Sequence, residues 1–226
     1  NAFIGGAGAD ALTGGSGNEI FFGGAGNDAI VTGDGHDVIA FNRGDGDDTV
    51  AASAGADNTL SLGGGIAYED LAFEKSGDDL ILDAGAGESV TLTGWYASAA
   101  NHSVLNLQVM AEAMAAFDAT SSDPLLNNKV EQFNFGGLVD RFDAVRAADP
   151  GVNRWALMDA LLDFHLGGGD SGALGGDLAH EYGKHGNLGN VGSTGAQNVL
   201  GNSQFGVTQQ TFQTPAGLQE GLVKLG

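Results

Sequence analysis

Residues 5–40 read GGAGADALT, GGSGNEIFF, GGAGNDAIV and TGDGHDVIA, four nine-residue units that follow one another without a gap. A fifth unit, RGDGDDTVA, occupies residues 43–51 after a two-residue insertion, and residues 1–4 have the form of the end of a preceding unit. The sixth position of the successive units holds Asn1, Asp10, Glu19, Asp28, Asp37 and Asp48. The eighth position is always apolar and holds Phe3, Leu12, Phe21, Ile30, Ile39 and Val50. A fixed period with both phases kept predicts a repeat architecture with one core residue per unit.

The composition of each unit divides it into a turn and a strand. The first six residues are rich in glycine, which adopts positive φ at low cost, and the last three suit a short strand. Two units then make one coil, and the turns of units n and n+2 stack on the same side. Since residue 1 already lies inside a unit, we expect the chain to be part of a longer protein.

The stacked turns predict a row of calcium sites. Each pair of turns presents backbone carbonyls and sixth-position carboxylates to the space between them, and a shell of six to eight such oxygens is what Ca²⁺ prefers. Magnesium fits such a shell poorly. We expect about three to four ions between residues 1 and 51. The candidate ligand residues are Gly5, Gly6, Gly8, Asp10, Gly14, Gly15, Gly17, Glu19, Gly23, Gly24, Gly26, Asp28, Gly33, Gly35, Asp37, Gly44, Gly46 and Asp48.

The repeat resembles the repeats-in-toxin (RTX, haemolysin-type) family, whose GGxGxDxUx unit forms a calcium-binding parallel β-helix. The resemblance implies a right-handed parallel β-roll over residues 1–51 that folds on calcium binding after type I export. The chain departs from the motif at Glu19, which is one methylene longer than aspartate, and at Thr32 and Arg43, which replace the first glycine of their units. These departures predict uneven occupancy.

Charge and composition limit the classes of partner and the types of metal site that this chain can have. The 29 acidic and 8 basic residues give a net charge of -21, which disfavours nucleic acid and anionic membranes as partners. There is no cysteine, so disulfides and thiolate metal sites are excluded. A flexible glycine-rich linker or a metal-free solenoid is the competing interpretation of the repeats, since glycine and aspartate are ordinary turn residues. Without an ion, stacked carboxylates repel and one apolar residue per unit buries too little, so the calcium-free repeat is expected to be disordered.

Residues 52–98 lose the nonapeptide period and show the alternation of antiparallel hairpins, as in DLAFEKSGDDLIL. This run resembles the capping segment that follows such repeats in secreted calcium-binding proteins, and a cap protects the open sheet edge. Trp95 and Tyr96 are expected to be core anchors. Asp57, Asp78 and Asp79 are interpreted as solvated turn residues rather than as a further calcium site.

Residues 99–226 are predicted to be mainly helical. Apolar residues recur every three or four positions, which predicts helices over residues 104–117, 129–147 and 153–166. The glycine-rich remainder resembles the C-terminal regions of large exported calcium-binding proteins, which implies an uncleaved signal for the type I secretion machinery.

The candidate zinc and catalytic motifs of this chain lack the spacing or the structural context that their chemistry requires. His180 and His185 are five residues apart, so they miss the four-residue spacing of a helical HExxH zinc pair. Ser16 lies inside a repeat and lacks the strand-to-helix context of a nucleophile elbow. The bonds Asp123-Pro124 and Asp149-Pro150 are interpreted as helix boundaries rather than self-cleavage sites. We therefore expect no enzymatic activity in this chain.

The sequence thus predicts a calcium-binding region of a larger secreted or cell-surface protein, adhesin-like or surface-layer-like, that self-associates. The alternative is a calcium-dependent targeting and folding module of a secreted toxin or hydrolase whose catalytic domain lies upstream.

Overall fold

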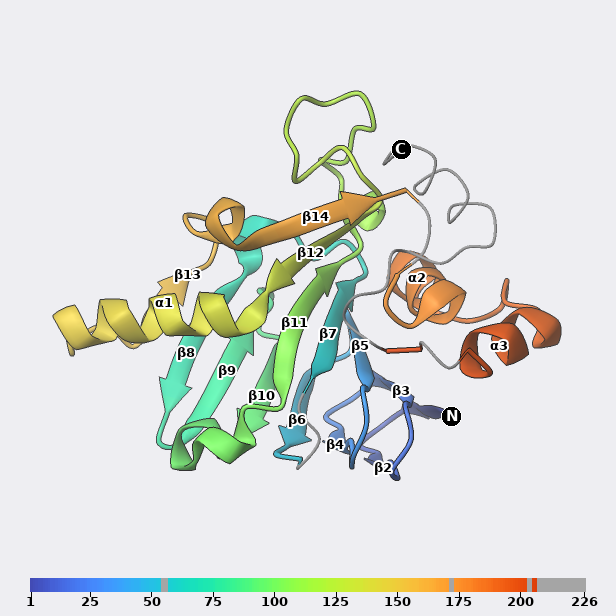
Figure 1. Cartoon of the computed structure of the whole chain (residues 1–226), viewed down its shortest axis with the longest axis horizontal. Coiled ribbons are helices and arrows are strands. Elements are labelled where there is room, and N and C mark those ends of the chain that lie inside the picture. Colours follow the sequence, from blue (N-terminus) through green and yellow to red (C-terminus); the bar gives the residue numbers. More distant parts are fainter. Residues whose placement is uncertain (54–56, 171–172, 203–204, 207–226) are drawn as a thin grey trace, which may run out of the picture.

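The chain forms two seven-stranded sheets that enclose a common core (Figure 1). The structure is a computed structural model, and it describes residues 1–53, 57–170, 173–202 and 205–206. Sheet A has the order β1 (Ala2–Ala7), β3 (Ile20–Ala25), β5 (Val38–Asn42), β7 (Asn58–Gly63), β11 (Val104–Val109), β12 (Val130–Asn134) and β14 (His165–Gly169). Sheet B has the order β13 (Arg154–Ala156), β8 (Ala72–Ser76), β9 (Asp79–Asp83), β10 (Ser89–Thr93), β6 (Asp47–Ala51), β4 (Ala29–Val31) and β2 (Ala11–Thr13).

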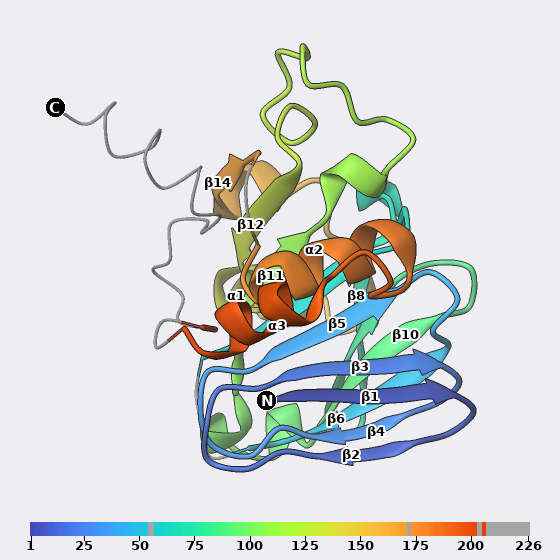
Figure 2. The ribbon, with the colours of Figure 1, turned by 90° about the vertical axis from the view of Figure 1, so that its right-hand side faces the viewer.

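The repeats build one end of both sheets by parallel pairing (Figure 2). Successive strands alternate between the sheets, so β1 pairs with β3 and β2 with β4. The register joins residues 18 positions apart, for example Ala2 with Ile20 and Ala11 with Ala29. Two nonapeptides therefore make one coil, as the period predicts.

The sheets continue past the repeats without a break in the core. β8, β9 and β10 pair antiparallel in succession, and β10 then pairs in parallel with β6 of the last repeat. The apolar cluster between the sheets includes residues of the repeats, of the hairpins and of the C-terminal third of the chain, such as Phe21, Leu82 and Leu161. The eighth-position side chains all lie in or against this cluster, which confirms their prediction as core residues.

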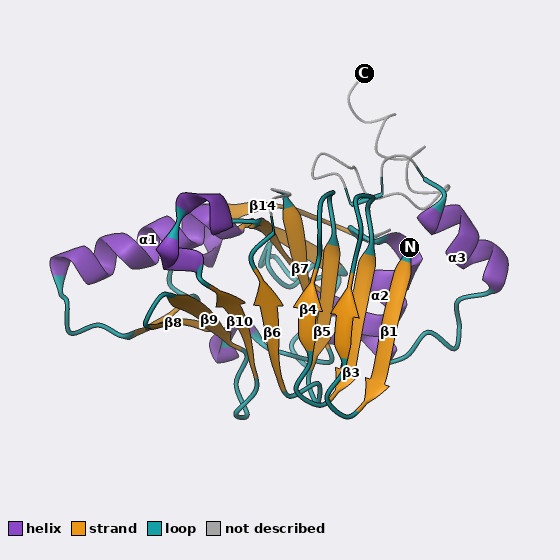
Figure 3. Ribbon diagram, turned by 90° about the horizontal axis from the view of Figure 1, so that it is seen from below, coloured by secondary structure: helices purple, strands orange, loops and turns teal. Residues whose placement is uncertain are grey.

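Helices cover the sheets at two places (Figure 3). α1 (Phe135–Ala148) contributes Phe135, Leu138 and Phe142 to the core between the sheets. α2 (Gly176–His185) and α3 (Ser193–Leu200) lie at the opposite end, over the outer face of sheet A, where a second apolar cluster includes Phe22 and Val38. Short 3-10 helices connect the elements: η1 (Tyr68–Asp70), η2 (Trp95–Ala97), η3 (Ala99–Asn101), η4 (Ala111–Ala113) and η5 (Leu161–Phe164).

Three helix predictions for the C-terminal region need correction. Residues 104–117 form strand β11 and the single turn η4. β11 is a central strand between β7 and β12, and its polar side chains Asn106 and Gln108 are buried and hydrogen-bonded to Asp57 and Ser61. The predicted helix 129–147 begins as strand β12, and only residues from Phe135 onward are helical. Residues 153–166 form β13, η5 and the start of β14. Outside α1, the buried apolar residues of these segments reach the core from strands and short turns rather than from helices.

Candidate calcium sites

The turns of the repeats stack into two columns, one at each end of the strands. Column 1 contains the turns 5–10, 23–28 and 43–48, and column 2 contains the turns 14–19 and 32–37. The second- and fourth-position glycines of all but the 14–19 turn have φ between +85° and +143°, as the expected turn geometry requires. A Cβ atom on Gly26 would collide with the Gly8 carbonyl oxygen, so the turns stack too closely for a side chain there.

Sixth-position side chains tie each turn to the one two units earlier. The Oδ1 atom of Asp28 accepts a hydrogen bond from the Asp10 backbone N–H at 2.8 Å, and Asp48 accepts from the Asp28 N–H at 2.9 Å. In column 2, Asp37 accepts from the Glu19 N–H at 2.8 Å. One oxygen of each of these carboxylates is therefore fixed by the backbone, which leaves the other free to face the column.

The second carboxylate oxygens are the feature that fits a cation. The Oδ2 atoms of Asp10, Asp28, Asp37 and Asp48 are buried, and none has a hydrogen-bond partner among the described residues. Asp28, Asp37 and Asp48 are at most 2 % exposed. A buried carboxylate without a partner is strongly unfavourable, so this arrangement calls for a positive charge.

Backbone carbonyls complete the surroundings of these oxygens. We call the space between a turn and the next turn of its column an interval. A Cβ atom on Gly23 would meet Asp28 Oδ2 and lie 3.1 Å from Asp48 Oδ2, so two carboxylates from successive turns face one interval. A Cβ on Gly5 would meet the carbonyl oxygen of Gly23 and lie 2.8 Å from Asp10 Oδ2. Carboxylates and carbonyls in this arrangement form the all-oxygen surroundings that Ca²⁺ prefers.

The third such interval lies in column 2. A Cβ on Gly14 would meet the Thr32 carbonyl oxygen and lie 3.0 Å from Glu19 Oε2. The intervals that follow Gly5, Gly14 and Gly23 therefore all combine a carbonyl or carboxylate of one turn with oxygens of the next. Without a cation, burial raises the pKa of Asp37 and of Asp48 to about 7, although backbone N–H groups hydrogen-bond to both.

Comparison with known families agrees with this geometry. The family of RTX calcium-binding nonapeptide repeats matches residues 4–39 and 42–65, in four copies. These repeats belong to the RTX family. RTX nonapeptide repeats bind calcium, and the candidate ligands predicted from the sequence lie in the matched residues or border them. No curated protein matches the chain.

Glu19 is the one sixth-position acid with both oxygens partnered. Its Oε2 accepts from the Gly15 N–H at 3.1 Å, and its Oε1 accepts from Asn1 Nδ2 at the same distance. The extra methylene lets the carboxylate reach back to its own turn. The Glu19 interval of this RTX array is therefore the one in which a cation competes with existing hydrogen bonds.

Asn58 continues the series of side-chain-to-backbone hydrogen bonds in column 2, and its role was not predicted from the sequence. Its Oδ1 accepts from the Asp37 N–H at 2.9 Å, as the aspartates do one coil earlier. Its Nδ2 donates to Thr32 Oγ1 at 3.2 Å. The buried Leu60 follows two residues later, at the spacing of an eighth-position RTX residue, and this signal could have identified Asn58.

The C-terminal part of the chain is bonded to the third turn of column 1. Asp45 Oδ2 accepts from the Asn42 N–H at 2.7 Å and from the Tyr182 hydroxyl of α2 at 3.0 Å. Burial raises the pKa of Asp45 to about 6. The inserted Asn42, whose Nδ2 donates to the Tyr182 carbonyl at 2.7 Å, and the third-position Asp45 thus anchor α2 to the RTX turns.

Other candidate ligands lie apart from the columns. Nε2 of His180 lies 3.1 Å from Glu112, whereas Nε2 of His185 lies 3.7 Å from Glu181. Among the described residues, no group of three or more histidine or acidic side chains is placed to hold a metal by side chains alone. Asp57 pairs with His36 at 3.3 Å. No helix in the described ranges is long and apolar enough to cross a membrane.

Proposed function

We propose that this chain is a calcium-dependent folding module of a secreted protein, in which calcium ions in the RTX intervals order the repeats after export. The observation that carries the proposal is the set of buried, unpartnered Oδ2 atoms of Asp10, Asp28, Asp37 and Asp48. Without cations these carboxylates oppose folding, and with cations they stabilise it. The parallel pairing of β1 to β7 supports a right-handed parallel β-roll closed by the β8–β10 hairpins.

Ion binding and folding form one coupled equilibrium in this proposal. Extracellular calcium modules have dissociation constants of roughly 10⁻⁴ to 10⁻³ M, so such sites stay empty at the sub-micromolar calcium of a cytosol. Each filled site stabilises the fold by RT ln(1 + [Ca²⁺]/Kd), and several sites that share carboxylates sharpen the transition. A chain that is unfolded inside the cell and folded outside suits one-step export through the type I secretion machinery.

The module acts without catalysis and serves an adhesin-like or surface-layer-like protein that self-associates at the cell surface. Support comes from the C-terminal third, which shares the core and both sheets with the repeats and so makes a large folded body rather than a short tail. The predicted export signal falls partly on residues 207–226, which lie outside the described residues. Sedimentation of the full chain tests this part: calcium-dependent oligomers support it, and a monomer at millimolar calcium contradicts it.

A calcium titration followed by circular dichroism, with magnesium as the control ion, tests the folding proposal. A cooperative gain of β signal near millimolar calcium, absent with magnesium, is expected. An unchanged spectrum across the titration would reject calcium-driven folding.

A further inference from the structure

The first residue of each RTX turn decides what fills the interval that follows it. The Cβ positions built on Gly5, Gly14 and Gly23 all approach oxygens of the next turn or of the shared carboxylates. A first-position side chain therefore points into the interval, and glycine leaves the interval open. In the two remaining turns this position holds Thr32 and Arg43, so their side chains enter the intervals at the ends of the two columns.

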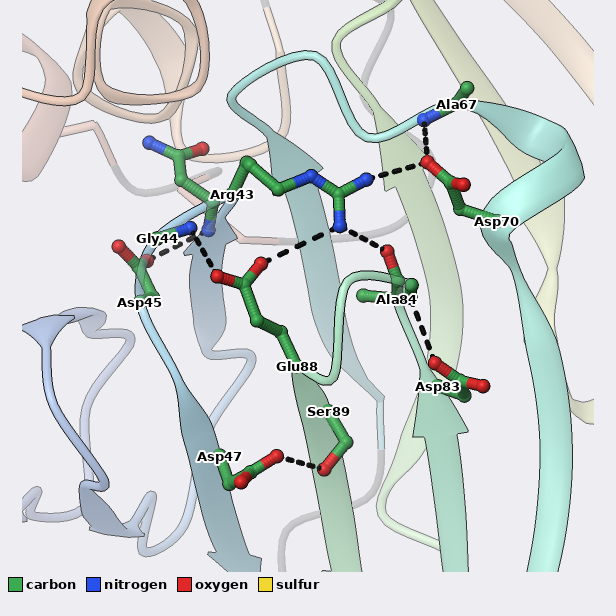
Figure 4. Close-up of polar contacts among 12 residues, drawn as sticks. Arg43, Gly44, Asp45, Asp47, Ala67, Asp70, Asp83, Ala84, Glu88 and Ser89 are labelled. Atoms are coloured by element: carbon green, nitrogen blue, oxygen red, sulfur yellow. Dashed lines mark hydrogen bonds and ion pairs between the residues drawn. The ribbon is translucent and has the colours of Figure 1, made fainter.

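Arg43 is surrounded by oxygens from the segments that follow the repeats (Figure 4). Its guanidinium donates to the Ala84 carbonyl at 2.7 Å and to Asp70 Oδ2 at 2.5 Å. Glu88 Oε2 lies 3.5 Å from the same group, and Glu88 Oε1 accepts from the Gly44 N–H at 2.8 Å. One carbonyl and two carboxylates are the ligand types that calcium meets in the open intervals.

Asp70 comes from η1, whereas Ala84 and Glu88 belong to the loop of residues 84–88, which stands where the next turn of column 1 would be. This loop precedes β10, which pairs in parallel with β6 and joins Ser89 to Asp47 in register. The Ser89 N–H donates to the Gly46 carbonyl at 3.1 Å, which fixes the loop over the third turn. Residues 84–88 thus continue the stack without a sixth-position aspartate, because Val90 stands opposite Asp48.

We propose that Arg43 is a built-in cation that replaces calcium at the end of column 1, so that the chain binds three calcium ions, in the intervals after Gly5, Gly14 and Gly23. This inference rests on the proposed function, since it assigns which RTX intervals take an ion. A guanidinium stays protonated at all physiological pH values and its planar donors match carboxylates. Arg43 therefore offsets one of the two negative charges at the seam between the repeats and the β8–β10 hairpins at any calcium concentration.

Column 2 ends in a comparable way. The Asp37 N–H needs an acceptor, so the Asn58 amide must present its oxygen to it and its nitrogen to Thr32 Oγ1. An amide NH₂ is a donor and does not ligate calcium. The Thr32 hydroxyl and the Asn58 amide satisfy each other there, where an open interval would hold an ion.

Calcium stoichiometry of the full chain, measured by titration calorimetry, tests the proposal. The wild type is expected to bind three ions. Arg43→Gly restores the first-position glycine and frees Asp70 and Glu88, and a fourth ion is expected. Arg154→Gly is the matched control, because Arg154 also pairs with two carboxylates, Asp83 at 2.7 Å and Glu74 at 3.1 Å, but outside the columns. This control is expected to keep three ions.

A wild type that binds more than three ions would overturn the assignment of Arg43 while leaving calcium-driven folding intact. An Arg43→Gly protein that folds in calcium and still binds three ions would do the same. If Arg43→Gly does not fold, the wild-type number decides alone. Absence of any calcium binding would reject the proposed function and this inference together.

Discussion

Filling one interval with a single methyl group should remove one calcium ion. In Gly23→Ala the new Cβ meets Asp28 Oδ2 and lies 3.1 Å from Asp48 Oδ2, so the two carboxylates can no longer converge on an ion. Gly23 is not among the glycines with positive φ, so backbone strain does not contribute. The added methyl group therefore displaces the Asp28 carboxylate from the interval without straining the backbone at residue 23.

The size of the effect follows from the linkage of binding to folding. With a Kd of about 10⁻⁴ M and about 10 mM calcium, one filled site stabilises the fold by about 2.7 kcal/mol. For a domain of this size, that loss lowers the Tm by about 5 to 10 °C. The stoichiometry should fall from three to two at the same time. Thermal unfolding in calcium measures the Tm, and titration calorimetry of the calcium-free chain with calcium measures the stoichiometry.

Gly15→Ala provides the matched control. Its Cβ would have only Glu19 Oε1 near it, at 3.9 Å, and its backbone also has no positive φ. We expect wild-type stoichiometry and a Tm within about 2 °C of wild type, since such a surface change costs little. If Gly23→Ala and Gly15→Ala lose the same stability in calcium, or if Gly23→Ala keeps the wild-type stoichiometry, the assignment of the interval after Gly23 is wrong.

Three further predictions concern single groups. Asp48→Asn should remove calcium from the interval after Gly23 and raise the calcium concentration at the midpoint of folding several-fold, as measured by a circular dichroism titration. Asp47→Asn makes the same charge change at an exposed neighbouring position and should leave this midpoint unchanged. Tyr182→Phe removes the buried hydroxyl that donates to Asp45, so the free energy of unfolding in calcium, measured with urea, should fall by about 2 kcal/mol. An unchanged urea midpoint would refute the role of this hydrogen bond. Burial raises the pKa values of Asp37 and Asp48 to about 7, above an unfolded value of about 3.9, so the calcium-free fold gains stability as the pH falls from 7 towards 4. Calcium needs both groups ionised, so its affinity should be at least about tenfold weaker at pH 6 than at pH 8, and a flat affinity profile would contradict the pKa shifts.

Helix prediction failed where strands are buried on both faces. Residues 104–109 have neighbours β7 and β12 in the sheet, and most of their side chains are covered. Asn106 and Gln108 alternate with apolar residues as in a strand, but Val104, Leu107 and Met110 also fit a helical spacing, and this second pattern led to the wrong prediction. Residues 129–134 were misassigned in the same way, because β12 pairs with β11 on one side and with β14 on the other. The first true helix was identified only from Phe135 onward.

The nonapeptide period by itself determined the coil of 18 residues, the apolar eighth positions and the stacking of the sixth-position carboxylates that we propose as calcium ligands. These features depend on residues within one or two units, where glycine conformation and side-chain alternation act locally. The tertiary structure alone showed which segments cover the ends of the two columns of turns. Arg43 pairs with Asp70 and Glu88, which lie 27 and 45 residues further along the chain. Tyr182 bonds to Asp45 across 137 residues. Contacts of this kind depend on how the sheets close around the core, and no periodic pattern records them.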